Sequence, residues 1–114
     1  MIRLYGIRNC DACRRAQHWL RDHDIEFQFS DIRDEILDES RLESWQEQLG
    51  WEPLLNKKSI TWRKIPAFDR AELNAKNART LILNYPTVMK RPVLEAGKKV
   101  ILGFDADEYA ALDL

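Results

Sequence analysis

The chain has 114 residues, a length that fits one domain with a buried core of its own. Its 45% hydrophobic and 10% aromatic residues exclude a disordered chain, and 18 basic against 19 acidic residues give a formal net charge of −1, which does not favour a nucleic-acid binder. No apolar run approaches the roughly 20 residues of a membrane-spanning helix, and the first residues lack the pattern of a secretory signal. We therefore expect a cytoplasmic protein that binds neither a membrane nor a nucleic acid.

The first 30 residues predict a β-α-β unit. Apolar and polar residues alternate over residues 2–6 and again over residues 25–29, which predicts two strands. Between them, apolar residues at helical spacing predict a helix from Asp11 to about Asp24. Such a unit favours parallel strands joined by a right-handed crossover.

The middle of the chain predicts three helices separated by loops. Asp38 is a suitable N-cap for a helix that ends at Gly50. Asp69 and Glu72 have the spacing of a capping box and predict a second helix there. Asn77 is a candidate N-cap for the third helix.

The stretch from about residue 38 to residue 85 contains no convincing strand. No linker-like composition flanks it, so we interpret residues 38–85 as a helical insertion in a single domain that spans residues 1–114. Within the insertion, the basic run 56–64 is typical of a solvated surface.

Strand signals return near the end of the chain, over residues 93–95 and 100–102. Gly97 between them indicates a hairpin, and Asp105 predicts the N-cap of a last short helix over residues 105–112. The element order is therefore βαβ, helical insertion, ββα. This order predicts an α/β fold with a small mixed sheet.

The CxxC motif of Cys10 and Cys13 lies where the first strand meets the first helix. Unpaired backbone N–H groups and the helix dipole favour an anion at a helix N-terminus, so this position lowers the pKa of a cysteine. Cys13 lies one helical turn further on, where it can approach Cys10 and resolve a mixed disulfide. Three nearby arginines add positive charge, and Asp11 opposes them.

Three other roles for the cysteine pair compete with redox chemistry. A structural disulfide would close only a tiny loop and restrict the unfolded chain little. Zinc would need His18 and His23 as further ligands, and side chains along one continuous helix cannot surround a tetrahedral ion. Both cysteines could also be small buried apolar residues. A CxxC motif beside a βαβ pattern favours redox chemistry over these roles, and no metal site is predicted.

A second candidate stretch is YPTVMKRPVL, which leads into the third predicted strand. The peptide bond between Arg91 and Pro92 can be cis, which would aim backbone groups toward a neighbouring site. Lys90 and Arg91 are cations that can meet an anionic substrate. Solvated charges at the entrance of a strand are an equally good interpretation.

Three stretches, LYGIRNCDACRRAQHWL, LGWEPLLNKK and KRPVLEAGKKVILGF, carry a resemblance to a known family. They resemble the arsenate-reductase-like (ArsC) family over essentially the whole chain, and within it the YffB and Spx-type subgroup, with YffB the closest. The resemblance implies a thioredoxin-like fold with a helical insertion and a cis peptide bond before Pro92. It also implies that Cys10 is a nucleophile and that Arg91 is an anion-binding arginine close to it.

The sequence departs from arsenate reductases of this type at two of three arginine positions. Asn56, followed by Lys57, replaces the arginine expected after paired leucines, and Gly103 replaces the arginine expected after the last strand. Only Arg91 matches. Because lysine does not replace the bidentate contacts of a guanidinium group, arsenate reduction is the third-ranked function.

The first-ranked function is a cytosolic thiol–disulfide oxidoreductase, specifically a glutathione-dependent thiol reductase. We expect glutathione or a protein disulfide as partner, glutathione as co-substrate, no tightly bound cofactor, and a monomer. Either Cys13 or a second glutathione would resolve the intermediate formed on Cys10. The alternative is an Spx-like, redox-sensing regulator that binds RNA polymerase. The predicted catalytic residues are Cys10, Cys13 and Arg91, and the predicted substrate-binding residues are Arg8, Asn9, Asn56, Lys57, Arg91 and Pro92.

Overall fold

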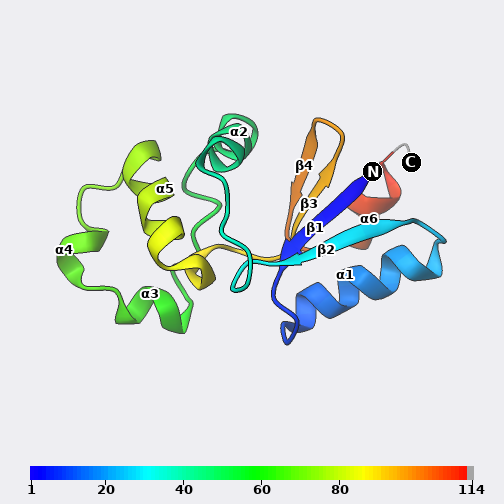
Figure 1. Cartoon of the computed structure of the whole chain (residues 1–114), viewed down its shortest axis with the longest axis horizontal. Coiled ribbons are helices and arrows are strands. Elements are labelled where there is room, and N and C mark those ends of the chain that lie inside the picture. Colours follow the sequence, from blue (N-terminus) through cyan, green and yellow to red (C-terminus); the bar gives the residue numbers. More distant parts are fainter. Residues whose placement is uncertain (113–114) are drawn as a thin grey trace. The chain divides into compact units, whose positions relative to one another are not determined.

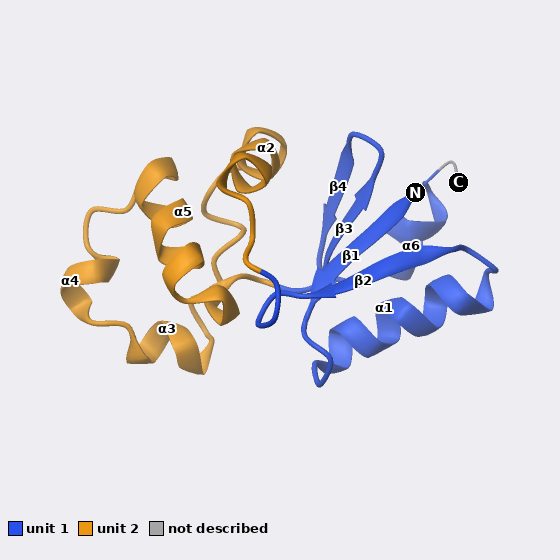
Figure 2. Cartoon of the chain, viewed as in Figure 1, with its two compact units in different colours: residues 1–35, 91–114 blue, residues 36–90 orange. Residues whose placement is uncertain are grey.

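The computed structural model describes residues 1–112. They form two compact units, one built from residues 1–35 together with the residues from 91 onward, and one built from residues 36–90 (Figure 2). The second unit corresponds to the predicted helical insertion, with slightly wider boundaries. That the whole chain behaves as one domain stays a prediction.

The first unit is a mixed sheet with two helices (Figure 1). Its elements are β1 (Ile2–Gly6), α1 (Asp11–Asp22), β2 (Phe27–Asp31), β3 (Val93–Ala96), β4 (Lys99–Leu102) and α6 (Ala106–Ala110). The four strands lie in the order β2-β1-β3-β4, with β1 parallel to β2, β1 antiparallel to β3, and β3 antiparallel to β4. The predicted βαβ unit and the predicted hairpin are therefore confirmed.

Strand β2 begins two residues later than the sequence predicts. After α1 ends, Asp24 takes a left-handed conformation with a φ of 54°, and the Ile25 N–H donates to the Leu20 carbonyl over 2.9 Å. This closure of the helix C-terminus keeps the following residues out of the sheet, and pairing with β1 starts at Phe27. The predicted strand over residues 25–29 is wrong by this shift.

A hydrophobic core cluster of the first unit lies on the face of its sheet that α1 and α6 cover. Apolar residues of α1 at helical spacing meet apolar residues that are neighbours across the strands. Burial of each large side chain contributes roughly 1.5–3 kcal/mol. Helix α6 begins after Asp105 as predicted, because the Asp105 carboxylate accepts from two backbone N–H groups. The buried residues of this cluster are Ile2, Leu4, Ala16, Leu20, Leu94, Ile101 and Tyr109.

Helices make up most of the second unit. They are α2 (Glu39–Leu49), α3 (Ile60–Lys64), α4 (Ala67–Arg70), α5 (Ala75–Asn84) and the 3₁₀ turn η1 (Pro86–Val88). Helix α2 is confirmed as predicted, with Asp38 as its N-cap and Gly50, at a φ of 83°, as its C-cap. Helices α2 and α5 pack together, and Arg79 Nη1 donates to Gln46 Oε1 over 2.8 Å between them.

Two short helices of the second unit differ from the prediction. The run 56–64 contains no buried residue, as expected of a solvated surface, but it also contains the unpredicted helix α3, whose N-cap Ser59 accepts from a backbone N–H with its side chain. Asp69 lies inside α4 instead of capping a helix. Glu72 takes a φ of 51°, which ends any helix at that point. The predicted capping box is therefore wrong.

The third predicted helix is present as α5, with a different cap. Asn74 is its N-cap, and its side-chain oxygen accepts from the Asn77 N–H over 2.8 Å. The predicted cap, Asn77, therefore lies in the first turn of the helix.

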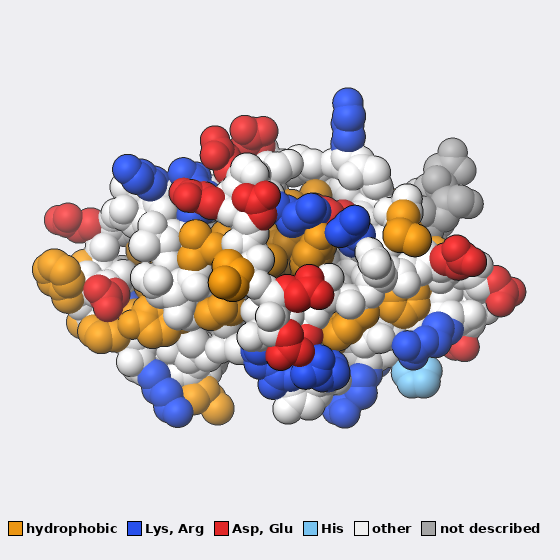
Figure 3. Space-filling view, viewed as in Figure 1, with side chains coloured by type: hydrophobic (Ala, Val, Ile, Leu, Met, Phe, Trp, Pro, Cys, Tyr) orange, Lys and Arg blue, Asp and Glu red, His pale blue; other side chains and the backbone are white. Residues whose placement is uncertain are grey.

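The surface carries both signs of charge. On the face drawn in Figure 3, Lys and Arg side chains are interspersed with Asp and Glu side chains, as the net charge of −1 leads one to expect. Within residues 1–112, no helix combines the length and the apolar character that crossing a membrane requires.

Candidate active site

Cys10 is the N-cap of α1, as the position of the motif predicts. Its backbone is extended, with φ −101° and ψ 127°, and its carbonyl accepts from the Arg14 N–H over 2.9 Å. Strand β1 leads to this position through the short loop 7–9. The Cys10 side chain is partly exposed. Its sulfur therefore lies at a helix N-terminus, where orphan N–H groups favour an anion.

The pKa of the Cys10 thiol lies below its ordinary value. Burial raises this pKa, but the Cys13 amide, the Cys13 thiol and the Arg91 guanidinium each lower it and together outweigh the burial. A lowered pKa enlarges the thiolate fraction near neutral pH, and the thiolate is the nucleophilic form. The site can therefore support attack by Cys10 on a disulfide.

Cys13 is the buried member of the pair. Its side chain is fully buried beside Gly6, where a Cβ atom on the glycine would collide with the Cys13 sulfur. Burial raises the pKa of Cys13 to about 12, with the Ile7 amide opposing this rise and Cys10 adding to it. Cys13 therefore keeps its proton at neutral pH and can present that proton to the Cys10 sulfur.

The peptide bond between Arg91 and Pro92 is cis, as the resemblance implies. Pro92 is buried, and its carbonyl accepts from the Gly103 N–H over 2.7 Å. The Arg91 guanidinium interacts with Cys10 both through a hydrogen bond and through its charge. The structure thus brings Cys10, Cys13 and Arg91 together, and their catalytic roles stay predictions.

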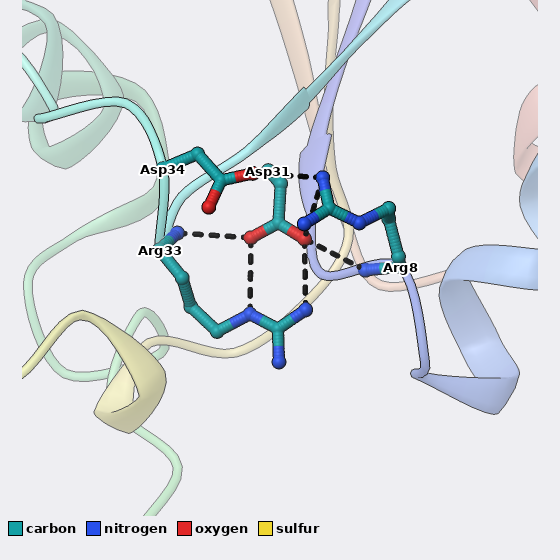
Figure 4. A network of polar contacts seen from close by, with 4 residues as sticks. All are labelled: Arg8, Asp31, Arg33 and Asp34. Atoms are coloured by element: carbon teal, nitrogen blue, oxygen red, sulfur yellow. Dashed lines mark hydrogen bonds and ion pairs between the residues drawn. The ribbon is translucent and has the colours of Figure 1, made fainter.

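Arg8 and Asn9 lie in the exposed loop just before Cys10. Arg8 Nη1 is 2.7 Å from Asp34 Oδ2 and 3.7 Å from Asp31 Oδ2, so its charge is already paired (Figure 4). Arg8 and Asp34 are both well exposed, and such pairs contribute only about 0.2–1 kcal/mol. An anionic substrate could therefore displace Asp34 from Arg8 at little cost.

Asn56 and Lys57 belong to the second unit. The Asn56 side-chain oxygen accepts from the Lys58 N–H over 3.1 Å, which shapes the turn before α3. Lys57 Nζ lies 5.7 Å from the centre of the Trp62 ring. Lys57 and Lys58 also line an open groove of about 520 Å³, together with Lys90. These contacts give Asn56 a structural role and leave Lys57 as a surface cation.

The sequence interpretation missed Asp31. This carboxylate is 4% exposed at the end of β2, and it accepts hydrogen bonds from Arg8 and Arg33. Hydrogen bonds from Arg33 lower its pKa well below the usual range, against the effect of burial. The signal in the sequence was an acidic residue two positions after the end of the predicted second strand, with an arginine two positions later.

The zinc alternative finds no support within residues 1–112. No group of three or more His, Cys, Asp or Glu side chains in that range is arranged to hold a metal ion. His23 instead stacks on Trp19 with 3.8 Å between ring centres, and its Nδ1 is 2.8 Å from the Trp19 carbonyl oxygen. These contacts place His23 at the C-terminal end of α1.

Comparison with known proteins decides the family. The ArsC family model matches residues 5–112. The chain belongs to the ArsC family. A solved structure named YffB is 37% identical to this ArsC-family chain, with 97% of each chain covered and a TM-score of 0.94. An arsenate reductase (ArsC) related protein from Brucella melitensis is 40% identical over 99% of this chain and 95% of its own, with a TM-score of 0.74.

A further relative carries a different function in its name. The global transcriptional regulator Spx of Streptococcus mutans is 32% identical, and the match covers 97% of this chain and 82% of the regulator. The fold itself is thioredoxin-like, an α/β fold with a mixed four-stranded sheet, as the resemblance implies.

Proposed function

We propose that this ArsC-family chain is a cytoplasmic thiol–disulfide oxidoreductase, a glutathione-dependent thiol reductase whose nucleophile is Cys10. One observation carries the proposal: the partly exposed Cys10 sulfur lies at the N-terminus of α1, where Cys13 and Arg91 lower its pKa. Electropositive, partly exposed positions of this kind are typical of reactive cysteines.

The proposed reaction runs through a mixed disulfide. The Cys10 thiolate attacks the glutathione sulfur of a substrate disulfide, a Cys10–glutathione bond forms, and the other sulfur leaves as a thiolate that takes a proton from water. A second glutathione thiolate then attacks the glutathione sulfur on Cys10. This step releases oxidised glutathione and restores the Cys10 thiolate, so that glutathione supplies both electrons.

Cys13 is less suited than a second glutathione to the resolving step. Its full burial and its pKa of about 12 leave very little thiolate at neutral pH, and the thiolate is the attacking form. We assign Cys13 the role of a thiol donor toward the Cys10 sulfur. Resolution by Cys13 would instead form a Cys10–Cys13 disulfide, which two glutathione molecules would have to reduce.

Arg91 is the proposed anchor for a glutathione carboxylate, because it is the cation that acts on Cys10. The remaining proposed contacts rest on the resemblance and on the exposed loop before Cys10. No tightly bound cofactor is required for this chemistry, and we expect a monomer. The further proposed substrate-binding residues are Arg8, Asn9, Asn56, Lys57 and Pro92.

Arsenate reduction remains the third-ranked function. The Asn56 side chain is engaged in a turn, and Gly103 takes a φ of 78°, a conformation that an arginine rarely adopts. An oxyanion site with Arg91 alone lacks two of the three guanidinium groups expected for that reaction. A steady arsenate-dependent turnover with glutathione and glutaredoxin would overturn this ranking.

The test is reduction of a glutathione-mixed disulfide by the full chain, with glutathione as electron donor and Cys10→Ser as the matched variant. We expect turnover by the wild type and none by the variant. Titration of glutathione into isotope-labelled protein should shift the amide signals of Cys10 and Arg91. The proposal fails if Cys10 alkylates no faster than free cysteine at neutral pH and no turnover is seen.

An Spx-like role is the second candidate, favoured by the 32% identity to the Streptococcus mutans regulator over 97% of this chain. In that case the Cys10–Cys13 pair would act as a redox switch on binding to RNA polymerase. Co-purification of the tagged chain with RNA polymerase, sensitive to oxidation, would support this role. Glutathione-linked turnover without a polymerase complex would count against it.

A further inference from the structure

The buried carboxylate of Asp31 takes no part in the proposed chemistry, yet it contacts the loop that leads to Cys10. Asp31 is the last residue of β2 and pairs with Gly6, the last residue of β1. Its Oδ2 accepts from the Arg8 backbone N–H over 3.0 Å and from Arg33 Nη2 over 2.9 Å. Its Oδ1 accepts from the Arg33 backbone N–H over 2.9 Å and from Arg33 Nε over 3.1 Å (Figure 4).

These four hydrogen bonds divide into two functions. The two bonds from the Arg33 guanidinium form a bidentate pair that fixes the carboxylate and balances its charge, and the Arg33 backbone N–H adds a third bond. The fourth bond is made outside the Asp31–Arg33 pair, to the backbone N–H of Arg8 in the loop between β1 and α1. A charge-assisted bond to a backbone N–H, made by a nearly fully buried carboxylate, restrains that loop strongly.

A single peptide unit connects Asp31 to the reactive cysteine. The peptide between Ile7 and Arg8 presents its N–H to Asp31 and its carbonyl to the Cys10 N–H, which lies 3.4 Å away. The Ile7 amide, one peptide earlier, interacts with the Cys13 sulfur. The orientation of this loop therefore affects both sulfurs.

We propose that Asp31 is a positioning residue, which orients the Ile7–Arg8 peptide and thereby holds Cys10 at the N-terminus of α1 in the geometry that favours its thiolate. This inference rests on the proposed function only where it concerns the reaction that the Cys10 thiolate carries out. Its own content, the reactivity of Cys10, can be measured without a substrate disulfide.

The direction of the effect separates positioning from simple electrostatics. A carboxylate near a thiolate repels it, so removing the Asp31 charge alone would make Cys10 more reactive at low pH. Loss of positioning has the opposite sign, because Cys10 then loses alignment with the groups that stabilise its thiolate. The titratable and charged groups that act on Cys10 directly are Cys13 and Arg91.

The experiment compares Asp31→Leu, which has no acceptor, with Asp31→Asn, which keeps one oxygen acceptor without the charge. Asp34→Asn is the matched control, since it makes the same charge change on the exposed partner of the Arg8 side chain. The rate of Cys10 alkylation by iodoacetamide is followed against pH in the full chain, with the modified site assigned by mass spectrometry.

We expect Asp31→Leu to react at least about threefold more slowly than the wild type near pH 6, with the midpoint of its pH profile moved upward. Asp31→Asn should lie nearer to the wild type, and Asp34→Asn should match the wild type. Equal or faster alkylation of Asp31→Leu would overturn the proposal. Identical pH profiles of Cys10 alkylation in Asp31→Leu and Asp31→Asn would also overturn it, because a pure charge effect predicts that result.

If circular dichroism shows that Asp31→Leu does not fold, a second variant decides. Ligation at Cys13 of a synthetic peptide for residues 1–12 allows the Arg8 N–H to be replaced by an ester oxygen, with Asp31 left intact. Slower alkylation of this ester variant near pH 6 supports positioning, and an unchanged profile overturns it. Failure of glutathione turnover in a wild type with normal Cys10 reactivity would refute the proposed function alone.

Discussion

Arg91 supplies a positive charge beside the Cys10 sulfur, and this contact gives a prediction with a definite sign. A lowered thiol pKa keeps Cys10 reactive at lower pH, so removing a cause of the lowering moves the reactivity profile upward. Arg91→Ala should raise the midpoint of Cys10 alkylation by about one pH unit and slow alkylation about tenfold near pH 6. Arg91→Lys should fall between the two. The control is Lys99→Ala, which removes an exposed cation on β4; an equal shift there would contradict a specific role for Arg91.

The two cysteines are expected to differ sharply when each is replaced by serine. Cys10→Ser should abolish reduction of a glutathione-mixed disulfide. Cys13→Ser should retain turnover within about threefold, because the serine hydroxyl can still donate a hydrogen bond and a second glutathione resolves the intermediate. The measurement is steady-state turnover with glutathione as donor. A loss of more than about tenfold in Cys13→Ser would show that Cys13 is the resolving thiol.

Among the helices described, the long ones were predictable from helical spacing, whereas of the short ones only α6 was predicted, from its N-cap Asp105. Helix α1 has 12 residues and α2 has 11, enough to show a helical period. Helices α3 and α4 have 5 and 4 residues, too few for any period to appear. Asn74 and Asn77 both satisfy the rule for an N-cap, and the structure identifies Asn74, whose side-chain oxygen accepts from the Asn77 N–H, as the residue that begins α5.

The choice of cap can be tested on the stability of the chain. Asn74→Ala removes the side-chain oxygen that accepts from the Asn77 N–H, and we expect it to lower the free energy of unfolding by about 1 kcal/mol. Asn77→Ala is the matched control, at an exposed position whose side chain donates to the Glu72 carbonyl over 3.2 Å. Urea denaturation of both variants measures the difference. A larger loss in Asn77→Ala than in Asn74→Ala would contradict the assigned cap.

At the scale of the whole molecule, a local sequence pattern was enough to predict the cysteine pair. The roles of Gly6 and Asp31 depend on the register of the sheet, which the sequence pattern does not show. Cys10 and Cys13 are one turn apart in any helix, so the CxxC motif alone brings them together. Arg91 lies far along the chain, and its place beside Cys10 came from the resemblance. Gly6 and Asp31 escaped notice because their importance depends on the pairing of β1 with β2, which brings the end of one strand opposite the end of the other.

The two compact units raise the question of whether the chain unfolds as one domain. Each unit has fewer than about 60 residues, and a domain of that size buries only about 60% of its unfolded surface, which leaves it marginally stable alone. We therefore expect one cooperative transition in urea. Amide signals of Leu4 and Leu94 report on the first unit, and those of Leu42 and Ile82 report on the second.

Coincident midpoints for these four signals would support a single domain, because two-state unfolding requires every probe to change together. The second unit is inserted between residues 35 and 91, so its unfolding would leave the first unit with a flexible loop of about 55 residues. The entropic cost of closing a flexible loop grows only slowly with its length. A first unit that is stable on its own would therefore stay folded when the second unit unfolds. Earlier loss of the Leu42 and Ile82 signals, with those of Leu4 and Leu94 retained, would therefore contradict the single-domain prediction.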